Sequence, residues 1–286
     1  MPDLYSPLSE NLLKKVLSVK DYLVSQEDFD LYYDEDWDMM LTYPVPKDLA
    51  PYYQSENYKP HQPKKKTVFD YVYRFIRQRN YAYKRNLIKA FHPKAQSVLD
   101  YGTATGEFLA YLSQNTFEVS GVEPNNKARQ YANKLLENNV RVSIDEIDKK
   151  FDVITLWHVL EHIKNLEELV VKLRQHLKPD GIILVAVPNF KSYDARYYKK
   201  YWGAYDVPRH LWHFSPLAIE KLFYKHGLTV LAQKPLFFDS FYVSLLSEQY
   251  KTGHKRLLPA FWTGLKSNIK ARRSGQYSSL IYVIGR

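Results

Sequence analysis

The stretch from Ser97 to Leu109, SVLDYGTATGEFL, constrains the fold more than any other part of this 286-residue chain. A short apolar run ends in Asp100, a turn of small residues follows, and Glu107 opens a pattern typical of a helix. Gly102 and Gly106 let the backbone adopt positive φ angles and approach a bound molecule closely. A buried strand that leads through a tight turn into a helix N-terminus is the arrangement with which open α/β sheets hold nucleotide-like ligands.

A second acidic residue narrows the choice of ligand. Glu123 closes the next apolar run, roughly 20 residues past the glycine turn, where a carboxylate can accept both ribose hydroxyls of an adenosine. The turn reads Gly102-x-Ala104-x-Gly106 rather than GxGxxG. Glu107 at the helix N-terminus would repel a pyrophosphate but not the charged amino acid end of S-adenosylmethionine (SAM). The residues therefore favour SAM over NAD as the cofactor.

Composition excludes several kinds of chemistry. The chain has no cysteine, which excludes disulfides, cysteine nucleophiles and zinc ribbons. It has no N-terminal apolar signal region and no run of roughly 18 or more apolar residues, so a cytoplasmic protein without a transmembrane segment is expected. The formal net charge of +10 favours anionic partners, such as nucleic acid, phosphorylated metabolites or an anionic membrane surface, without choosing among them.

The patterns along the chain predict two domains. Residues 1–65 are punctuated by prolines and show no strong periodicity, so we expect an irregular, cysteine-free N-terminal lobe. The second domain covers residues 66–286 and opens with a helix over Thr67–Phe91. Between Ser97 and Asn189, apolar runs alternate with helical patterns, which is typical of a parallel, doubly wound α/β sheet.

The pattern changes after Asn189. Residues 191–214 form an aromatic and basic loop, after which Ser215-Pro216 predicts the N-cap and first residue of a helix. Residues 237–273 are predicted to be a helical insertion, and its basic, amphipathic part is expected to be a lid over the substrate pocket. The alternative is a helix that lies on an anionic membrane or grips an anionic substrate.

Taken together, these segments resemble the class I SAM-dependent methyltransferases, especially small bacterial members related to the ubiquinone-biosynthesis methyltransferases. The resemblance is carried, in order, by VLDYGTATGEFL, GVEPN, FDVITLWHVLEHI, LKPDGIILVAVPN and WGAYDVPRHLWHFSP. It implies a Rossmann-like seven-stranded sheet of order 3-2-1-4-5-7-6 with the last strand antiparallel, and it makes 191–214 a substrate-side loop. The chain departs from its relatives at Ala104, where they have a glycine, and in the cysteine-free lobe.

The expected cofactor-binding residues follow from the turn, from the second strand and from the resemblance. They are Asp100, Gly102, Ala104, Gly106, Glu123, Asp145 and Trp157. Relatives place an acidic residue near the adenine after the third strand, where this chain offers Asp145, Glu146 and Asp148. Trp157 is expected to line the pocket, and core packing is the alternative for it.

His158 follows the fourth strand, at the sheet edge where ligands bind in such folds. Because a histidine near its ordinary pKa can deprotonate a hydroxyl or amine during methyl transfer, His158 is the first candidate for a general base and His210 or His213 the second. Glu161 and His162 are expected to brace the following helix. A metal held by His158, Glu161 and His162 is an alternative, but metal-dependent relatives have a carboxylate where His158 stands, and no metal is assigned.

The function predicted from these residues is transfer of a methyl group from SAM to an oxygen or nitrogen atom of a small molecule, with an anionic or lipid-linked acceptor in view. Peripheral contact with a membrane is left open. One alternative is an RNA-modifying methyltransferase, which the interleaved aromatic and basic side chains would suit although nucleic acid is the less favoured partner. The other is a SAM-binding protein without catalytic activity.

Overall fold

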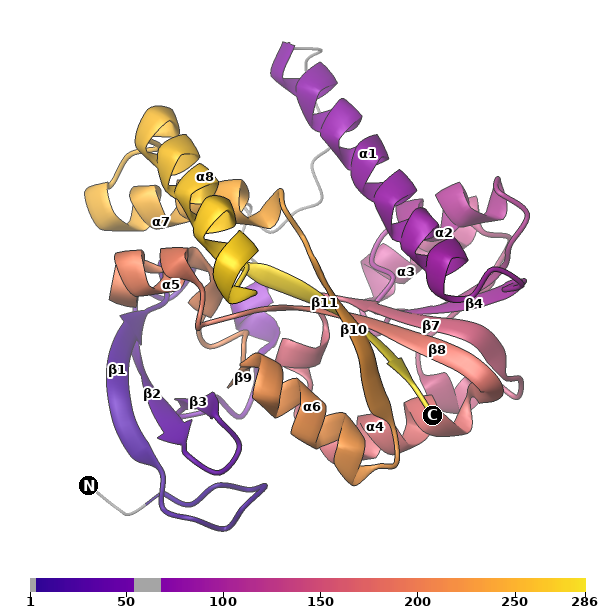
Figure 1. Ribbon diagram of the computed structural model, residues 1–286, viewed down its shortest axis with the longest axis horizontal. Coiled ribbons are helices and arrows are strands. Elements are labelled where there is room, and N and C mark those ends of the chain that lie inside the picture. Colours follow the sequence, from indigo (N-terminus) through magenta and orange to yellow (C-terminus); the bar gives the residue numbers. More distant parts are fainter. Residues whose placement is uncertain (1–3, 54–67) are drawn as a thin grey trace. The chain divides into compact units, whose positions relative to one another are not determined.

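The computed structural model of the chain describes residues 4–53 and 68–286, with side chains from residue 75 onward in the second range. The predicted domain boundary at 65–66 lies outside the described residues and stays a prediction. The strands are β1 (Lys14–Lys20), β2 (Asp28–Asp34), β3 (Met39–Tyr43), β4 (Ser97–Tyr101), β5 (Glu118–Val122), β6 (Val140–Arg141), β7 (Phe151–Trp157), β8 (Leu177–Pro188), β9 (Trp212–His213), β10 (Thr229–Pro235) and β11 (Ser279–Gly285). The α-helices are α1 (Val68–Phe91), α2 (Glu107–Ser113), α3 (Asn126–Leu135), α4 (Leu166–Gln175), α5 (Tyr193–Tyr198), α6 (Pro216–Lys225), α7 (Asp239–Thr252) and α8 (Leu257–Ser274), as Figure 1 labels most of them.

Seven strands form one sheet in the order β10-β11-β8-β7-β4-β5-β6. Counted within this sheet, the order is 3-2-1-4-5-7-6 with the last strand antiparallel, so the predicted Rossmann-like, doubly wound fold is confirmed. β4 pairs in parallel with both β5 and β7. Residues such as Leu99 and Ile154 are fully buried, which explains why these strands read as continuous apolar runs.

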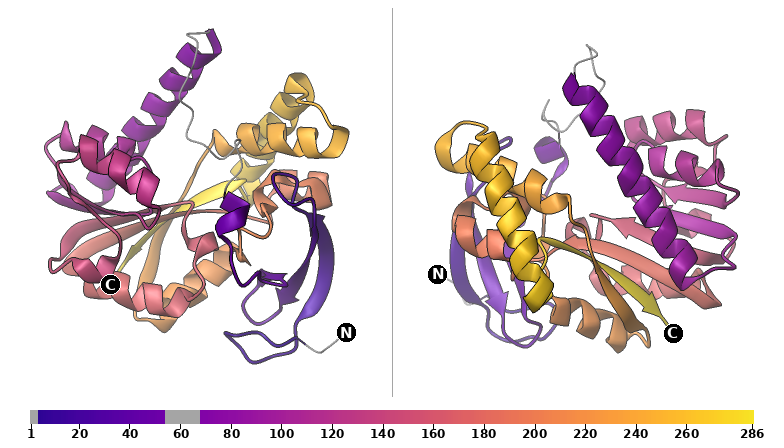
Figure 2. Two further views of the ribbon diagram at one scale, coloured as in Figure 1. Left: turned by 180° about the vertical axis from the view of Figure 1, so that it is seen from behind. Right: turned by 45° about the horizontal axis from the view of Figure 1, so that its top comes forward.

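The chain divides into two compact units. The first unit is formed by Met1–Tyr58, His158–Glu167 and Val185–Tyr282, and the second unit by Lys59–Trp157, Glu168–Leu184 and Val283–Arg286. In the second unit, α1, α2 and α3 lie on one side of the strands and α4 on the other (Figures 1 and 2).

The N-terminal part of the first unit differs from the irregular lobe that the sequence predicted. β1, β2 and β3 pair antiparallel, and β9 completes a four-stranded sheet. Phe29 and Leu31 alternate with acidic neighbours along β2, a period-2 pattern that is short and rich in aspartate and therefore weak as a sequence signal. The partner strand β9 lies far along the chain, so the pairing is not visible locally.

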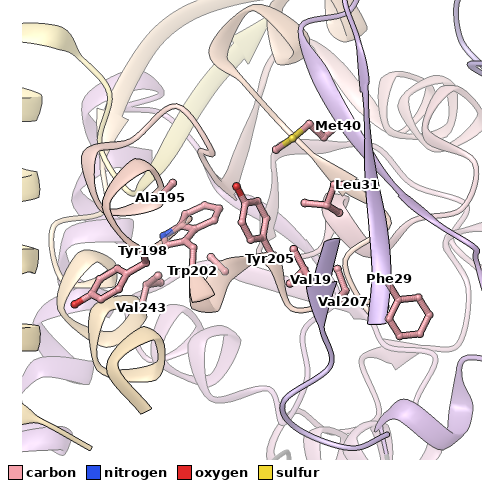
Figure 3. Close-up of a cluster of buried hydrophobic side chains, with 11 residues drawn as sticks. Val19, Phe29, Leu31, Met40, Ala195, Tyr198, Trp202, Tyr205, Val207 and Val243 are labelled. Atoms are coloured by element: carbon pink, nitrogen blue, oxygen red, sulfur yellow. The ribbon is translucent and has the colours of Figure 1, made fainter. Parts of the chain in front are cut away.

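A buried apolar cluster holds this sheet to the segment after β8 (Figure 3). Leu31 and Met40 from the sheet pack in one cluster with Trp202 and Tyr205 from the predicted substrate-side loop and with Val243 from α7. The loop therefore shares a buried core with this sheet and with α7, and it contains α5 and β9.

The helical predictions after β8 are confirmed. Ser215 caps α6, since its Oγ accepts a hydrogen bond from the backbone N–H of Ala218, and Pro216 is the first helical residue. The predicted insertion folds as α7 and α8. Within the parts of the chain that the structure describes, no helix combines the length and hydrophobicity that crossing a membrane requires.

Candidate cofactor and acceptor sites

Glu123 holds the glycine bend, residues 102–106, from the end of β5. Its Oε2 accepts a hydrogen bond from the backbone N–H of Ala104 at 2.8 Å, and its Oε1 accepts one from the backbone N–H of Asn125 at 2.8 Å. The residue is only 8% exposed. Each carboxylate oxygen has a further lone pair, so the group can still accept hydroxyl protons from a ligand at the bend.

The backbone of the bend has the left-handed geometry that its glycines predict. Gly102 and Gly106 both have φ near +78°, and a Cβ on Gly106 would lie 2.9 Å from the Cβ of Ala132. Ala104 occupies the same region of φ at +49°, which is uncommon for a residue with a side chain. The alanine that departs from the family pattern thus keeps the conformation of the bend.

Asp100 lies buried at the end of β4. Thr155 on the neighbouring strand β7 donates its hydroxyl proton to Oδ1 of Asp100 at 2.5 Å. Burial raises the pKa of Asp100 to about 6, although the hydrogen bond from Thr155 and the charge of Lys84 oppose the shift. The carboxylate is therefore mostly ionised at neutral pH and close to its titration.

Glu107 at the start of α2 is paired, which changes one argument from the sequence. Nη1 of Arg77 on α1 lies 2.7 Å from Oε2 of Glu107, and the hydroxyl of Tyr81 donates to the same oxygen at 3.2 Å. Because Arg77 neutralises the carboxylate, repulsion of a pyrophosphate by Glu107 no longer argues against NAD. Neither partner was predicted from the sequence.

The remaining two predicted cofactor residues have different surroundings. Trp157 packs edge-on against Phe108, and Nζ of Lys84 lies 4.0 Å from the centre of its ring. Nε1 of Trp157 is buried and has no hydrogen-bond partner among the described residues, which leaves a donor for a ligand. The carboxylate of Asp145 is exposed and paired with Lys172 at 2.8 Å, and its contact with an adenine stays a prediction.

His158 in the first unit is enclosed by carboxylates. Nδ1 lies 3.3 Å from Oε1 of Glu161, and Nε2 lies 2.9 Å from Oδ2 of Asp239 on α7. Burial opposes the charged form, but the two carboxylates outweigh it and raise the pKa of His158 to about 10. Because both ring nitrogens then donate protons, this arrangement does not favour the predicted role as a general base, which stays untested. Asp239 was missed by the sequence analysis.

His210 and His213 are buried with different partners. Nδ1 of His210 lies 2.9 Å from the carbonyl oxygen of Ala204. Thr42 donates its hydroxyl proton to the carbonyl of His210, so Nε2 of His213 donates to the Thr42 oxygen at 3.0 Å. Burial lowers the pKa of both rings, that of His213 to about 3. Both are therefore neutral, and their roles as alternative bases stay predictions.

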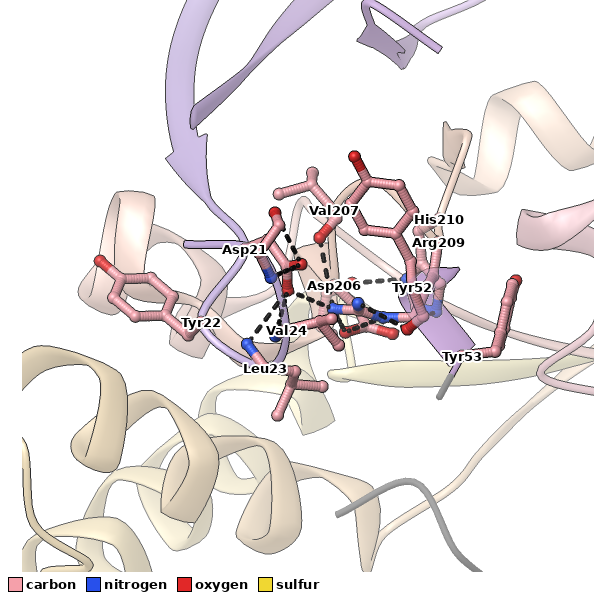
Figure 4. A network of polar contacts seen from close by, with 12 residues as sticks. Asp21, Tyr22, Leu23, Val24, Tyr52, Tyr53, Asp206, Val207, Arg209 and His210 are labelled. Carbon is pink, nitrogen blue, oxygen red and sulfur yellow. Dashed lines mark hydrogen bonds and ion pairs between the residues drawn. The ribbon is translucent and has the colours of Figure 1, made fainter. Parts of the chain in front are cut away.

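A buried ion-pair network fixes the segment that carries His210 (Figure 4). Nη2 of Arg209 lies 2.9 Å from Asp21 and 2.7 Å from Asp206, and its side chain is only 1% exposed. The guanidinium also donates to the carbonyl oxygen of Tyr52. The network ties the turn after β1 to the residues that precede β9.

A groove of about 680 Å³ opens elsewhere in the first unit. Its lining includes Phe190, Lys191, Arg196 and Leu217 but none of the predicted site residues. Lys191 is already paired with Asp38 at 2.6 Å, so the groove adds no free charge for a ligand at that position.

Comparison with known proteins gives matches in sequence and in structure. Ubiquinone biosynthesis O-methyltransferase of Rickettsia typhi is 32% identical over 100 residues, which are 32% of this chain and 41% of that protein. The protein of the same name from Rickettsia bellii is 30% identical over 103 residues, 32% of this chain and 42% of that protein. The matched region thus spans less than half the length of these curated relatives. The solved structure of the cyclopropane synthase MmaA2 from Mycobacterium tuberculosis is 14% identical, with a TM-score of 0.48 over 70% of this chain and 83% of that chain.

A family match covers a larger part of the chain. Residues 75–233 match the family described as methyltransferase domain. This range begins within α1, contains the glycine bend, Glu123 and all three candidate histidines, and ends in β10. The matched range is more than half of the chain, and it contains most of the strands of the seven-stranded sheet. This chain therefore belongs to the methyltransferase domain family.

Proposed function

We propose that this protein binds SAM at the glycine bend and transfers the methyl group to an oxygen or nitrogen atom of a small-molecule acceptor. The observation that carries the proposal is the orientation of Glu123, a buried carboxylate turned toward the bend with lone pairs left for the ribose hydroxyls. SAM supplies an activated methyl group on a positively charged sulfur, and the chain supplies position and electrostatics.

The predicted cofactor residues at the ends of β4 and β7 and in the glycine bend each have a proposed part in holding SAM. The positive φ angles of Gly102, Ala104 and Gly106 allow the backbone to approach the ligand closely. Asp100, ionised at neutral pH, attracts the ammonium group of the methionine portion. The unpartnered Nε1 of Trp157 offers a hydrogen bond at the end of β7.

For the acceptor we propose the polar cluster that begins with His158, directly after Trp157 in the chain. His158 is held between Glu161 and Asp239, and 36% of its side chain remains exposed. In this setting His158 acts as a fixed positive charge that orients the carboxylate of Glu161, and the acceptor proton is taken up by another group.

Helix α8 supports a lipid-linked acceptor. The face that it buries is made of small residues, and Gly264 is so close to α7 that a Cβ would lie 3.0 Å from the backbone nitrogen of Phe241. Its large apolar side chains point outward and are 49–73% exposed: Leu257, Leu258, Phe261, Trp262 and Ile269. Basic residues, among them Lys255, Arg256, Lys266 and Lys270, accompany them in the sequence. A helix with exposed apolar and basic side chains suits an anionic membrane surface.

The test of the proposed function is calorimetric titration of the purified protein with SAM and with its demethylated product. We expect saturable binding of both ligands, and absence of binding at millimolar ligand would refute the proposal. The protein is then incubated with cell extract and SAM, and the products are analysed by mass spectrometry. A compound that gains the mass of one CH₂ unit only when active protein is present is the acceptor.

A further inference from the structure

Three side chains of the first unit bring their ligand atoms together in a place that the proposed SAM site does not use. We propose that Glu161, His162 and His210 bind a divalent transition-metal cation of the Zn²⁺ type. One ligand atom from each residue lies within 4.8 Å of the other two. The centres of the two imidazole rings are 4.6 Å apart.

Glu161 provides a buried oxygen without a partner. The residue is 1% exposed, and its Oε1 faces Nδ1 of His158 at 3.3 Å. Its Oε2 is buried and accepts no hydrogen bond from any residue that the structure describes. A buried, ionised oxygen without a hydrogen bond is costly, and a cation at this position would satisfy it.

The backbone selects the tautomer of both histidines. Nδ1 of His162 lies 2.9 Å from the carbonyl oxygen of Arg209 and 3.0 Å from the hydroxyl oxygen of Tyr53, and Nδ1 of His210 lies 2.9 Å from the carbonyl oxygen of Ala204. A carbonyl oxygen can only accept, so each Nδ1 carries the proton and each Nε2 keeps a lone pair. An imidazole that donates from one nitrogen to a carbonyl and ligates through the other is the usual state of a metal-bound histidine.

The frame around these residues holds the ligands before a metal arrives. The backbone N–H of Leu211 donates to the carbonyl oxygen of Glu161 at 2.8 Å, which joins the segments that carry the ligands. The side chain of Arg209 is fixed by Asp21 and Asp206, so the carbonyl group that orients His162 is fixed as well (Figure 4). Such support favours binding because little ordering remains to be done.

The chemistry of the ligands selects the kind of metal. Two imidazole nitrogens and one carboxylate oxygen suit Zn²⁺, Fe²⁺ and related ions, whereas Mg²⁺ prefers oxygen ligands. From the sequence no metal is assigned, and the alternative is a site formed by His158, Glu161 and His162. Both ring nitrogens of His158 face carboxylates, and His210 takes its place in the site proposed here.

Three protein ligands leave coordination positions open, as in catalytic zinc sites. A hydroxyl group bound there would lose its proton more easily. This role in acceptor activation rests on the proposed function, but metal binding itself does not.

The experiment uses the full chain without an affinity tag, stripped with a chelator and dialysed. Zn²⁺ is titrated in competition with a chromophoric chelator, bound zinc is counted by elemental mass spectrometry, and Co²⁺ reports ligand geometry through its visible absorption. We expect one zinc per chain. Glu161→Gln, which preserves the shape of the side chain, and His162→Ala should each weaken binding by more than the roughly 10–100-fold that loss of an outer hydrogen-bond partner costs.

The control is His254→Ala, a change of an exposed histidine that follows α7, which should keep the affinity of the unmodified chain. Circular dichroism checks that each variant is folded. Substoichiometric zinc in the unmodified chain, or equal affinity in the folded Glu161→Gln variant, would overturn the proposal. Titration of the metal-free chain with SAM separates the two proposals. A chain that binds zinc but not SAM would refute the proposed function alone, and a chain that binds SAM but not zinc would refute the metal site alone.

Discussion

The backbone N–H of Ala104 donates to the carboxylate of Glu123 at 2.8 Å, so the end of β5 is tied to the middle of the glycine bend. One side chain thereby fixes the bend and faces the place where we propose that a ribose binds. The same contact explains why an alanine is tolerated in the bend, since the hydrogen bond uses its backbone and not its side chain.

Replacing Glu123 by glutamine should weaken SAM binding by roughly 10–100-fold, because charge-assisted hydrogen bonds contribute about 1.5–3 kcal/mol. Calorimetric titration with SAM measures the change. The control is Glu118→Gln on the same strand, whose side chain is 67% exposed and should leave the affinity unaltered. If both variants bind SAM like the original chain, Glu123 does not hold the ribose.

Ala104→Gly should raise the free energy of unfolding by up to about 1 kcal/mol, because glycine removes the penalty of a side chain at a φ of +49°. Ala110→Gly in helix α2 is the matched change and should lower the free energy by about 1 kcal/mol. Urea unfolding distinguishes the two signs. A loss of stability in Ala104→Gly equal to that in Ala110→Gly would contradict the idea of strain in the bend.

SAM affinity should rise between pH 5 and 7.5 because Asp100 ionises. If only the ionised form binds, a pKa of about 6 predicts affinity about tenfold weaker at pH 5. Calorimetry across this pH range tests the expectation, and Asp100→Asn should flatten the profile. A pH profile that is unchanged by Asp100→Asn would rule Asp100 out as the titrating group.

The same residue predicts a change in stability with pH. Burial raises the folded pKa of Asp100 above its ordinary value of 3.8, so the folded chain binds this proton more tightly than the unfolded chain. The stabilising contribution is complete below the ordinary pKa and is lost as the pH rises through about 6. Between pH 5 and pH 8, the free energy of unfolding measured in urea should fall less in Asp100→Asn than in the original chain.

Arg209→Met should lower the free energy of unfolding by about 3–5 kcal/mol, because it leaves the buried carboxylate of Asp21 and the largely buried carboxylate of Asp206 without their cation. The control is Lys149→Met, because the side chains of Lys149 and its partner Glu118 are 43% and 67% exposed. That change should stay within about 1 kcal/mol. Denaturant unfolding of both variants measures the difference, and equal losses would remove the argument from burial.

Trp262→Ser should reduce binding to anionic lipid vesicles at least tenfold if α8 lies on a membrane, because burial of an aromatic side chain contributes about 1.5–3 kcal/mol. Co-sedimentation with vesicles of mixed anionic and neutral lipid measures it. The control is Tyr224→Ser on α6, which removes an aromatic side chain that is 76% exposed. Absence of binding by the original chain, or equal losses in both variants, would contradict the membrane proposal.

The sequence by itself determined the parts of the protein that depend on neighbours along the chain. Apolar runs, the glycine turn and the capping pair Ser215-Pro216 set the strands, the bend and α6, because periodicity, positive φ and helix caps act over a few residues. The position of Glu123 beside the bend was also predicted from the sequence, since β4 and β5 are parallel neighbours and end at the same edge of the sheet.

Only the tertiary structure decided which charges meet. Arg77 neutralises Glu107, Asp239 and Glu161 hold the proton on His158, and β9 joins the sheet of β1–β3. These pairs are distant in sequence or depend on the direction of a side chain, so no local sequence pattern predicts them. The balance between desolvation and a partner's charge sets the state of such groups, and that balance exists only once the chain has folded.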